Sequence, residues 1–126
     1  MGHSYRDLIV WQKTVAMVTG VYRATQCFLR QETYGLTSQI RRSAVSVASN
    51  IAEGQGRLSR REFHHFLGME RGSLIEMETQ AVIAENLGYL PAVEARHLAV
   101  ASGEVSRLLH GLMQSLQKTE PRVTGN

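Results

Sequence analysis

The chain has 126 residues, a formal net charge of +3, one cysteine and two prolines. This length predicts one domain, 1–126, with a core of its own. Cys27 alone excludes an internal disulfide, and the first 20 residues contain Arg6, Asp7 and Lys13 but no long apolar run, so we expect no signal peptide, no membrane span and a cytoplasmic location.

The first predicted helix spans about residues 6–28. Its expected core row has the spacing of a bundle seam and consists of Leu8, Trp11, Val15, Val18, Tyr22 and Leu29. Val10, Met17 and Val21 form a second apolar ridge, about 100° around the same helix. One bundle core does not need both ridges, so we expect Val10, Met17 and Val21 to contact another subunit.

The second predicted helix spans about residues 36–53 and ends at Gly54 as its C-cap. Its expected core row is Leu36, Ile40, Ala44, Val47 and Ile51. The opposite side carries Val45, Ala48 and Ala52 where charged residues are usual, which predicts a subunit contact there. Residues 54–57 faintly resemble a phosphate-binding loop, but they follow no strand, so a plain turn between helices is the preferred interpretation.

Ser59 and Glu62 have the spacing of a capping box, which predicts the start of a third helix over about 59–87. Gly88 is expected to end this helix, and a fourth helix follows over about 92–118. Connections this short predict an all-α, antiparallel up-down four-helix bundle, with a frayed tail over 119–126. The expected core rows are Phe63, Phe66, Leu74, Met77, Ala81 and Ala84, then Leu98, Ala101, Val105, Leu109, Leu112 and Leu116.

Several segments together carry a family likeness. They include Arg6-Asp7-Leu8, Val10-Trp11-Gln12-Lys13, Tyr34-Gly35-Leu36, Ser49-Asn50-Ile51-Ala52-Glu53-Gly54 and Leu87-Gly88-Tyr89. Over about residues 6–116 the chain resembles the four-helix-bundle proteins encoded by intervening sequences in bacterial 23S ribosomal RNA genes. The resemblance implies a basic, ring-like homopentamer with no known enzymatic activity. Relatives are similar to the accessory variability determinants of diversity-generating retroelements, which implies nucleic acid and a reverse transcriptase as partners.

Glu70 departs from the family pattern, which usually has a small apolar residue there. It falls in the middle of the expected apolar row of the third helix, between Phe66 and Leu74. A buried carboxylate needs a hydrogen-bond donor, which we expect a neighbouring helix or subunit to supply. Glu70 is either a functional carboxylate or, as is commoner for such positions, a structural polar contact.

Metal binding and catalysis find little support in the residue pattern. His64 and His65 lie close to Glu62, but adjacent residues of a helix point about 100° apart, whereas chelation needs steps of three or four. No nucleophile lies beside a base at local spacing, so we expect no enzyme, no metal and no cofactor.

Positive charge gathers in two clusters that flank the second helix. Arg41 and Arg42 lie near its start, and Arg57, Arg60 and Arg61 follow its end. Arginine forks suit phosphates, so we expect these five residues to bind RNA or DNA with little sequence specificity. The alternatives are that Arg41 pairs with an acid of the adjacent subunit while Arg42 is solvated, and that the protein is a scaffold for a partner such as a reverse transcriptase.

Overall fold

The computed structural model describes residues 4–57 and 59–119, with the backbone alone for 56, 57 and 117–119. These residues contain no strand, so the chain is all-α as predicted. Apart from Thr119, the predicted frayed tail lies outside the described residues. The elements in chain order are η1 (Tyr5–Asp7), α1 (Ile9–Thr25), η2 (Arg30–Glu32), α2 (Leu36–Arg57), α3 (Arg60–Asn86) and α4 (Ala92–Thr119).

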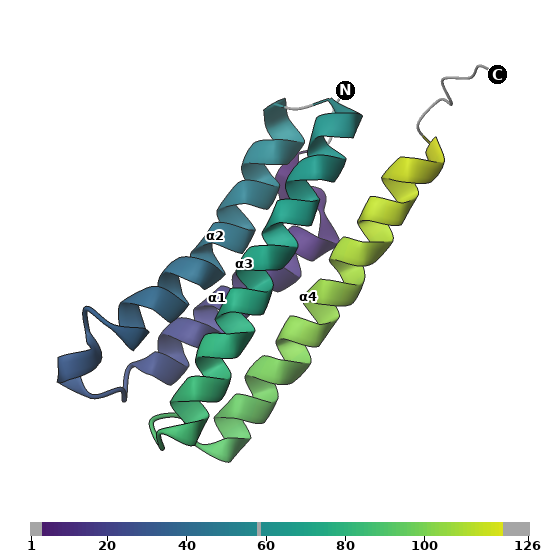
Figure 1. Cartoon of the computed structure of the whole chain (residues 1–126). Coiled ribbons are helices and arrows are strands. Elements are labelled where there is room, and N and C mark those ends of the chain that lie inside the picture. The colour runs from purple at the N-terminus through teal and green to yellow at the C-terminus, as the bar shows by residue number, and fades with distance from the viewer. Residues whose placement is uncertain (1–3, 58, 120–126) are drawn as a thin grey trace.

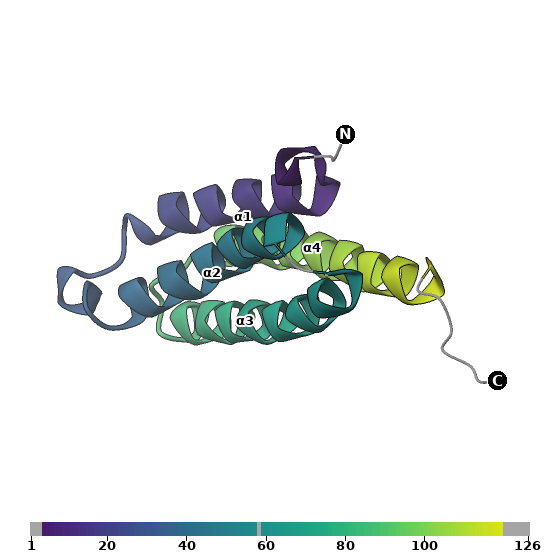
Figure 2. The same cartoon turned by 90° about the horizontal axis from the view of Figure 1, so that it is seen from above.

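The four α-helices lie side by side with their long axes roughly aligned (Figure 1). Contacts join α1 to α2, α2 to α3, α3 to α4 and α4 back to α1. Seen from above, α1 and α3 lie on opposite sides, with α2 and α4 between them (Figure 2). The four helices enclose an apolar core, to which each contributes fully buried side chains. Within residues 4–57 and 59–119, none of the helices is long and apolar enough to cross a membrane.

The inward face of α1 is not the predicted one. Val15, Tyr22 and Leu29 of the expected core row are 36 %, 41 % and 46 % exposed. The residues that α1 and the segment after it bury are Val10, Thr14, Met17, Val21, Thr25 and Phe28. The predicted subunit contact through Val10, Met17 and Val21 is therefore wrong, because these side chains fill the chain's own core.

Two threonines explain why the inward row of α1 looks like the lesser of two apolar ridges in the sequence. The Thr14 hydroxyl donates a hydrogen bond to the backbone carbonyl of Val10 at 2.6 Å, and the Thr25 hydroxyl donates to that of Val21 at 2.8 Å. These bonds satisfy both hydroxyls within the helix, so threonine can be buried here at little cost. Because two of the six members of this row are threonines, a count of apolar residues alone identifies only part of it.

The C-terminal end of α2 also differs from the prediction. The helix continues through Gly54 to Arg57, so Gly54 is not a C-cap and residues 54–57 are not a turn. Gly54 is buried, and a Cβ atom at this position would lie 3.1 Å from Cδ1 of Phe63 and 3.3 Å from Cδ1 of Phe66. The glycine therefore lets two phenyl rings of α3 approach the α2 backbone.

The start and the end of α3 agree with the prediction. The side chain of Ser59 accepts a hydrogen bond from the backbone N–H of Glu62, and the Glu62 carboxylate accepts one from the backbone N–H of Ser59, both at 3.2 Å. Hydrogen bonds to the Glu62 carboxylate from the backbone N–H and the side chain of Ser59 lower the pKa of Glu62. At the other end, Gly88 has φ +81°, a backbone conformation that favours glycine and ends the helix.

The connection between α1 and α2 is fixed to the turn between α3 and α4. The hydroxyl of Tyr89 donates to the Glu32 carboxylate at 3.1 Å, and the ring centroids of Phe28 and Tyr89 are 5.7 Å apart. The other carboxylate oxygen of Glu32 accepts from the backbone N–H of Leu36 at 3.1 Å, in the first turn of α2. Glu32 thereby holds in place the segment that carries Tyr34.

The capping box gives a first prediction. Ser59→Ala should lower the free energy of unfolding by about 1 kcal/mol, because it removes the acceptor for an N–H group of the first turn of α3. Urea titration followed by circular dichroism measures this. Ser49→Ala, at an exposed serine inside α2, is the matched control and should not destabilise the protein, because alanine favours helix more than serine does. Equal losses in both variants would contradict a capping role for Ser59.

Candidate functional site

Arg41 is attached to α1 by three contacts. Its Nε donates to the Thr25 hydroxyl at 2.8 Å, and its Nη2 donates to the backbone carbonyl of Tyr22 at 3.2 Å. Its guanidinium carbon also lies 4.5 Å from the centroid of the Tyr22 ring, a cation–π distance. The expected acid partner from an adjacent subunit is thus not needed to hold Arg41, because α1 of the same chain already orients it.

Arg42 is exposed and lies beside Arg41 on the outer surface of α2. The two arginines line a hollow of about 540 Å³ between α1 and α2, which we call the α1–α2 hollow. Tyr22, Tyr34 and Thr37 also line it, and its lining includes no aspartate or glutamate. The structure therefore brings together one predicted pair of arginines and surrounds it with aromatic rings and hydroxyl groups that the sequence analysis did not single out.

The second arginine cluster lies at the other end of α2. Arg60 and Arg61 are exposed in the first turn of α3, and the side chain of Arg57 lies outside the described part of the chain. Arg42 and Arg57 are 15 residues apart on α2, which corresponds to roughly 20 Å along its axis. Figure 1 shows the start of α2 and the start of α3 at opposite ends of the molecule. The five predicted residues therefore do not form one surface patch in a single chain.

A row of polar side chains joins α2 to α3. The Ser43 hydroxyl lies 3.0 Å from the side-chain carbonyl oxygen of Gln80, to which it can donate. Nδ2 of Asn50 donates to Oγ of Ser46 at 3.1 Å, and Oγ of Ser46 lies 3.4 Å from Oγ of Ser73. A hollow of about 420 Å³ opens along this row, and Arg42 and Glu76 line it with the serines. Polar side chains therefore form much of the α2–α3 contact.

Glu70 belongs to this polar row and is 2 % exposed. Asn50 of α2 provides its side-chain hydrogen bond, so the predicted donor from a neighbouring helix is confirmed. The Oε1 atom of Glu70 has no hydrogen-bond partner among the described residues. Burial raises the pKa of Glu70 to about 7, with the Asn50 hydrogen bond opposing this rise. A carboxyl group with only one partner is less costly to bury when protonated.

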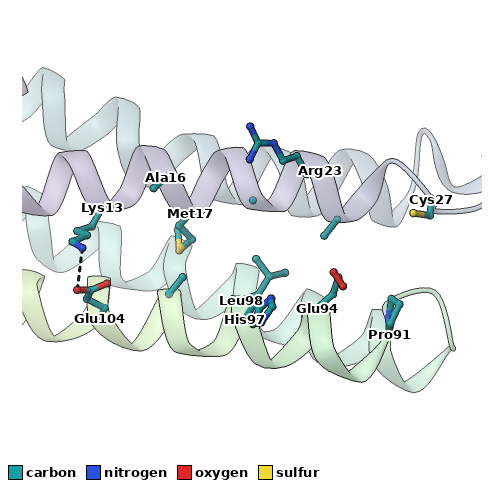
Figure 3. A pocket seen from close by; sticks show the side chains of 13 residues that line it. Lys13, Ala16, Met17, Arg23, Cys27, Pro91, Glu94, His97, Leu98 and Glu104 are labelled. Carbon is teal, nitrogen blue, oxygen red and sulfur yellow. Dashed lines mark ion pairs between the residues drawn. The ribbon is translucent and has the colours of Figure 1, made fainter.

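A groove of about 560 Å³ separates α1 from α4 (Figure 3). Met17 and Leu98 form part of its floor, and Lys13 and Glu104 make an ion pair across it at 3.4 Å. Both side chains of this pair are substantially exposed, so its contribution to stability is small. Cys27 is also at this groove and is exposed. The groove combines both signs of charge with an apolar floor and brings together no recognisable reactive pair.

Histidines do not form a metal site in the described part of the chain, where no group of three or more His, Cys, Asp or Glu residues could hold an ion. His64 is half-buried and His65 is exposed, on neighbouring faces of α3.

The second predicted subunit contact remains available on the surface. Val45 is 38 % exposed, and Ala48 and Ala52 are half-buried. A larger apolar surface, not predicted from the sequence, faces outward from α3. We call it the outer α3 face, and its residues Ile75, Val82 and Ile83 are 58 %, 56 % and 43 % exposed. Ile75, Val82 and Ile83 stand at i, i+7 and i+8, a helical spacing that is visible in the sequence and separate from the inward row.

The raised pKa of Glu70 predicts a pH dependence of stability. Between pH 4.5 and about 7, folded chains keep a proton on Glu70 that unfolded chains have released, so stability falls as pH rises through this interval. Glu70→Gln removes this titration. From pH 4 to pH 8, the stability of the variant relative to the wild type should therefore increase by up to about 3 kcal/mol.

Urea titrations at fixed protein concentration measure this difference. Glu85→Gln, which neutralises an exposed carboxylate of the same helix, is the control and should show no comparable change with pH. A Glu70→Gln variant whose stability follows the same pH course as the wild type would contradict the assignment.

Comparison with known proteins places the chain in a family. No curated protein matches it. The model of the 23S rRNA-intervening sequence protein family matches residues 6–111, which include α1, α2 and α3 whole and most of α4. The matched region contains Arg41 and Arg42, the polar row between α2 and α3, and the outer α3 face. The chain therefore belongs to the family of 23S rRNA-intervening sequence proteins.

Proposed function

We propose that this protein is a non-enzymatic homo-oligomer, a ring-like pentamer, that binds nucleic acid through arginine patches with little sequence specificity. The observation that carries the proposal is the pair Arg41 and Arg42. Arg41 is oriented by Thr25 and Tyr22, and Arg42 is exposed beside it. A cation that is already held in place loses less entropy when it binds a phosphate than a mobile one does.

The family to which the chain belongs also supports this proposal. It is named for proteins of 23S ribosomal RNA intervening sequences and is not a known enzyme family. Within each subunit we propose an up-and-down order of helices, because the connection between α3 and α4 spans only residues 87–91 and the two helices touch along their length. Every subunit would then present the Arg41–Arg42 pair at the same end.

Assembly is the step that would make small patches effective. Each chain offers two separated arginine patches, and a ring repeats each of them around its circumference. Phosphate contacts add to one another in salt-dependent binding, and linked sites raise the effective concentration of the next contact. The outer α3 face is the best-supported subunit contact, because three large apolar side chains are exposed there on one side of the helix. Val45, Ala48 and Ala52 are the second candidate.

A protein scaffold is the competing function. The outer α3 face suits a different protein as well as a second copy of this chain, and arginines also bind acidic protein surfaces. The partner could be a reverse transcriptase to which this chain is an accessory subunit. A partner that stays bound after nuclease treatment would favour the scaffold over nucleic-acid binding.

Salt dependence tests the nucleic-acid proposal. The affinity for RNA or duplex DNA should fall steeply with salt concentration, because each phosphate contact releases counterions. Arg42→Gln should weaken binding to both and reduce the slope of log affinity against log salt by about one for each subunit that touches the strand. Fluorescence anisotropy titrations at several salt concentrations measure both quantities. Arg96→Gln, at an exposed arginine of α4, is the matched control. Binding that is absent at low salt, or insensitive to salt, would refute the proposal.

Light scattering tests the assembly. The wild-type protein should give several times the chain mass of 14.1 kDa. Val82→Glu, which places a charge in the outer α3 face, should shift the mass toward that of one chain, whereas Val45→Glu should not. The opposite result would move the contact to Val45, Ala48 and Ala52, and a monomeric wild type would reject both surfaces.

A further inference from the structure

We propose that the α1–α2 hollow is a pocket for single-stranded nucleic acid, in which an unpaired base stacks on Tyr34 and the neighbouring phosphate is held by Arg41 and Arg42. This inference rests on the proposed nucleic-acid function and adds the class of ligand, an unpaired strand rather than a duplex.

Tyr34 is the stacking surface. Its side chain is 95 % exposed, so the ring contributes almost nothing to the core. The segment that carries it is nevertheless held in place, since the backbone N–H of Gly35 donates to the Glu32 carbonyl at 2.9 Å and that of Leu36 to the Glu32 carboxylate. An exposed aromatic ring on a fixed segment beside arginines is the arrangement with which proteins bind bases of single strands.

The charges of the hollow have one sign. Arg41 uses Nε and Nη2 to bind α1, and the hydrogens on its Nη1 have no partner among the described residues. Arg42 is exposed next to it, and no carboxylate lines the hollow. The α2–α3 hollow and the α1–α4 groove differ, because Glu76 lines the first and Glu94 and Glu104 line the second. Of these three sites, the α1–α2 hollow alone therefore suits an anion without a competing internal acid.

Thr37 is a polar residue of the lining of the hollow. Its side chain lines the hollow and is 8 % exposed, and its hydroxyl oxygen has no hydrogen-bond partner among the described residues. This oxygen is closed off from the surface, so a ligand in the hollow does not reach it, and the polar groups that the hollow offers to a ligand are those of Arg41 and Arg42.

The test compares two labelled RNAs, a single-stranded oligouridylate and a fully paired duplex of the same length, by fluorescence anisotropy on the full chain. Tyr34→Ala should weaken oligouridylate binding by roughly 5- to 100-fold, because this is the usual effect of removing one stacking side chain. Duplex binding, which uses the arginines only, should change less than twofold. Tyr34→Phe keeps a ring and should restore most of the lost affinity.

Two further variants separate stacking from general effects. Thr37→Val keeps the shape of the side chain without its hydroxyl and should leave oligouridylate binding unchanged, because the hydroxyl oxygen is buried. Leu29→Ala removes an exposed apolar side chain that does not line the hollow, and it should bind both RNAs as the wild type does. Circular dichroism melts of each variant show whether the fold is retained, and with Tyr34 so exposed we expect no loss there.

The outcomes distinguish this inference from the function on which it rests. If the wild type binds both RNAs in a salt-dependent way and Tyr34→Ala binds oligouridylate as tightly as the wild type, the single-strand pocket is refuted while the nucleic-acid function stands. A Tyr34→Ala variant that loses duplex and single-strand binding equally also refutes stacking. A wild type that binds neither RNA at low salt refutes the proposed function and the pocket together.

Discussion

The structure depends on α2, because the inner face of this helix is buried and its two flanks are hydrogen-bonded to α1 and to α3. Ile40, Val47 and Ile51 are fully buried in the core. On one side Arg41 bonds to α1, and on the other a row of serines and Asn50 meets α3. Buried polar groups must find partners, so these contacts allow α2 few rotations about its own axis. The direction in which Arg42 points follows from that constraint.

Glu70 is a buried polar group whose hydrogen bonds are incomplete. Asn50, its one partner in the part of the chain that the structure describes, also donates to Ser46, so the polar row does not give the carboxylate the two or three donors that would stabilise its charge. The raised pKa is the consequence, and protonation lets the carboxyl group remain between the helices. Because Asn50 and Ser46 belong to the same row, we expect a substitution of Glu70 to disturb the α2–α3 contact more than the apolar core.

The core rows of α2 and α4 were predictable because their buried positions carry apolar residues at regular helical spacing. Ile40, Val47 and Val105 are all fully buried as expected. The prediction was wrong where the type of a residue suggested a role other than the one it has. In α1 threonines complete the inward row, and in α2 Gly54 serves the approach of Phe63 rather than a helix end. Both depend on tertiary contacts that spacing does not reveal.

The charged residues of the candidate site could be predicted from the sequence, but the contacts that orient them could not. Arg41 and Arg42 stand out in the sequence, but the residues that orient Arg41 are Thr25 and Tyr22, 16 and 19 positions earlier in the chain. Such a contact exists only once α1 and α2 have packed. Tyr34 falls between the first two predicted helices, and nothing in its local pattern indicates that this connection is fixed by Glu32.

The two proposed surfaces constrain each other. The α1–α2 hollow is formed by helices on one side of the molecule, whereas the outer α3 face belongs to a helix that does not contact α1 in the described residues. Assembly through the outer α3 face would leave the hollow accessible in every subunit. Val45 lines the hollow, so assembly through Val45 would cover the pocket that an unpaired strand needs. Nucleic-acid binding in the hollow therefore requires the subunit contact to lie elsewhere, and the outer α3 face meets that requirement.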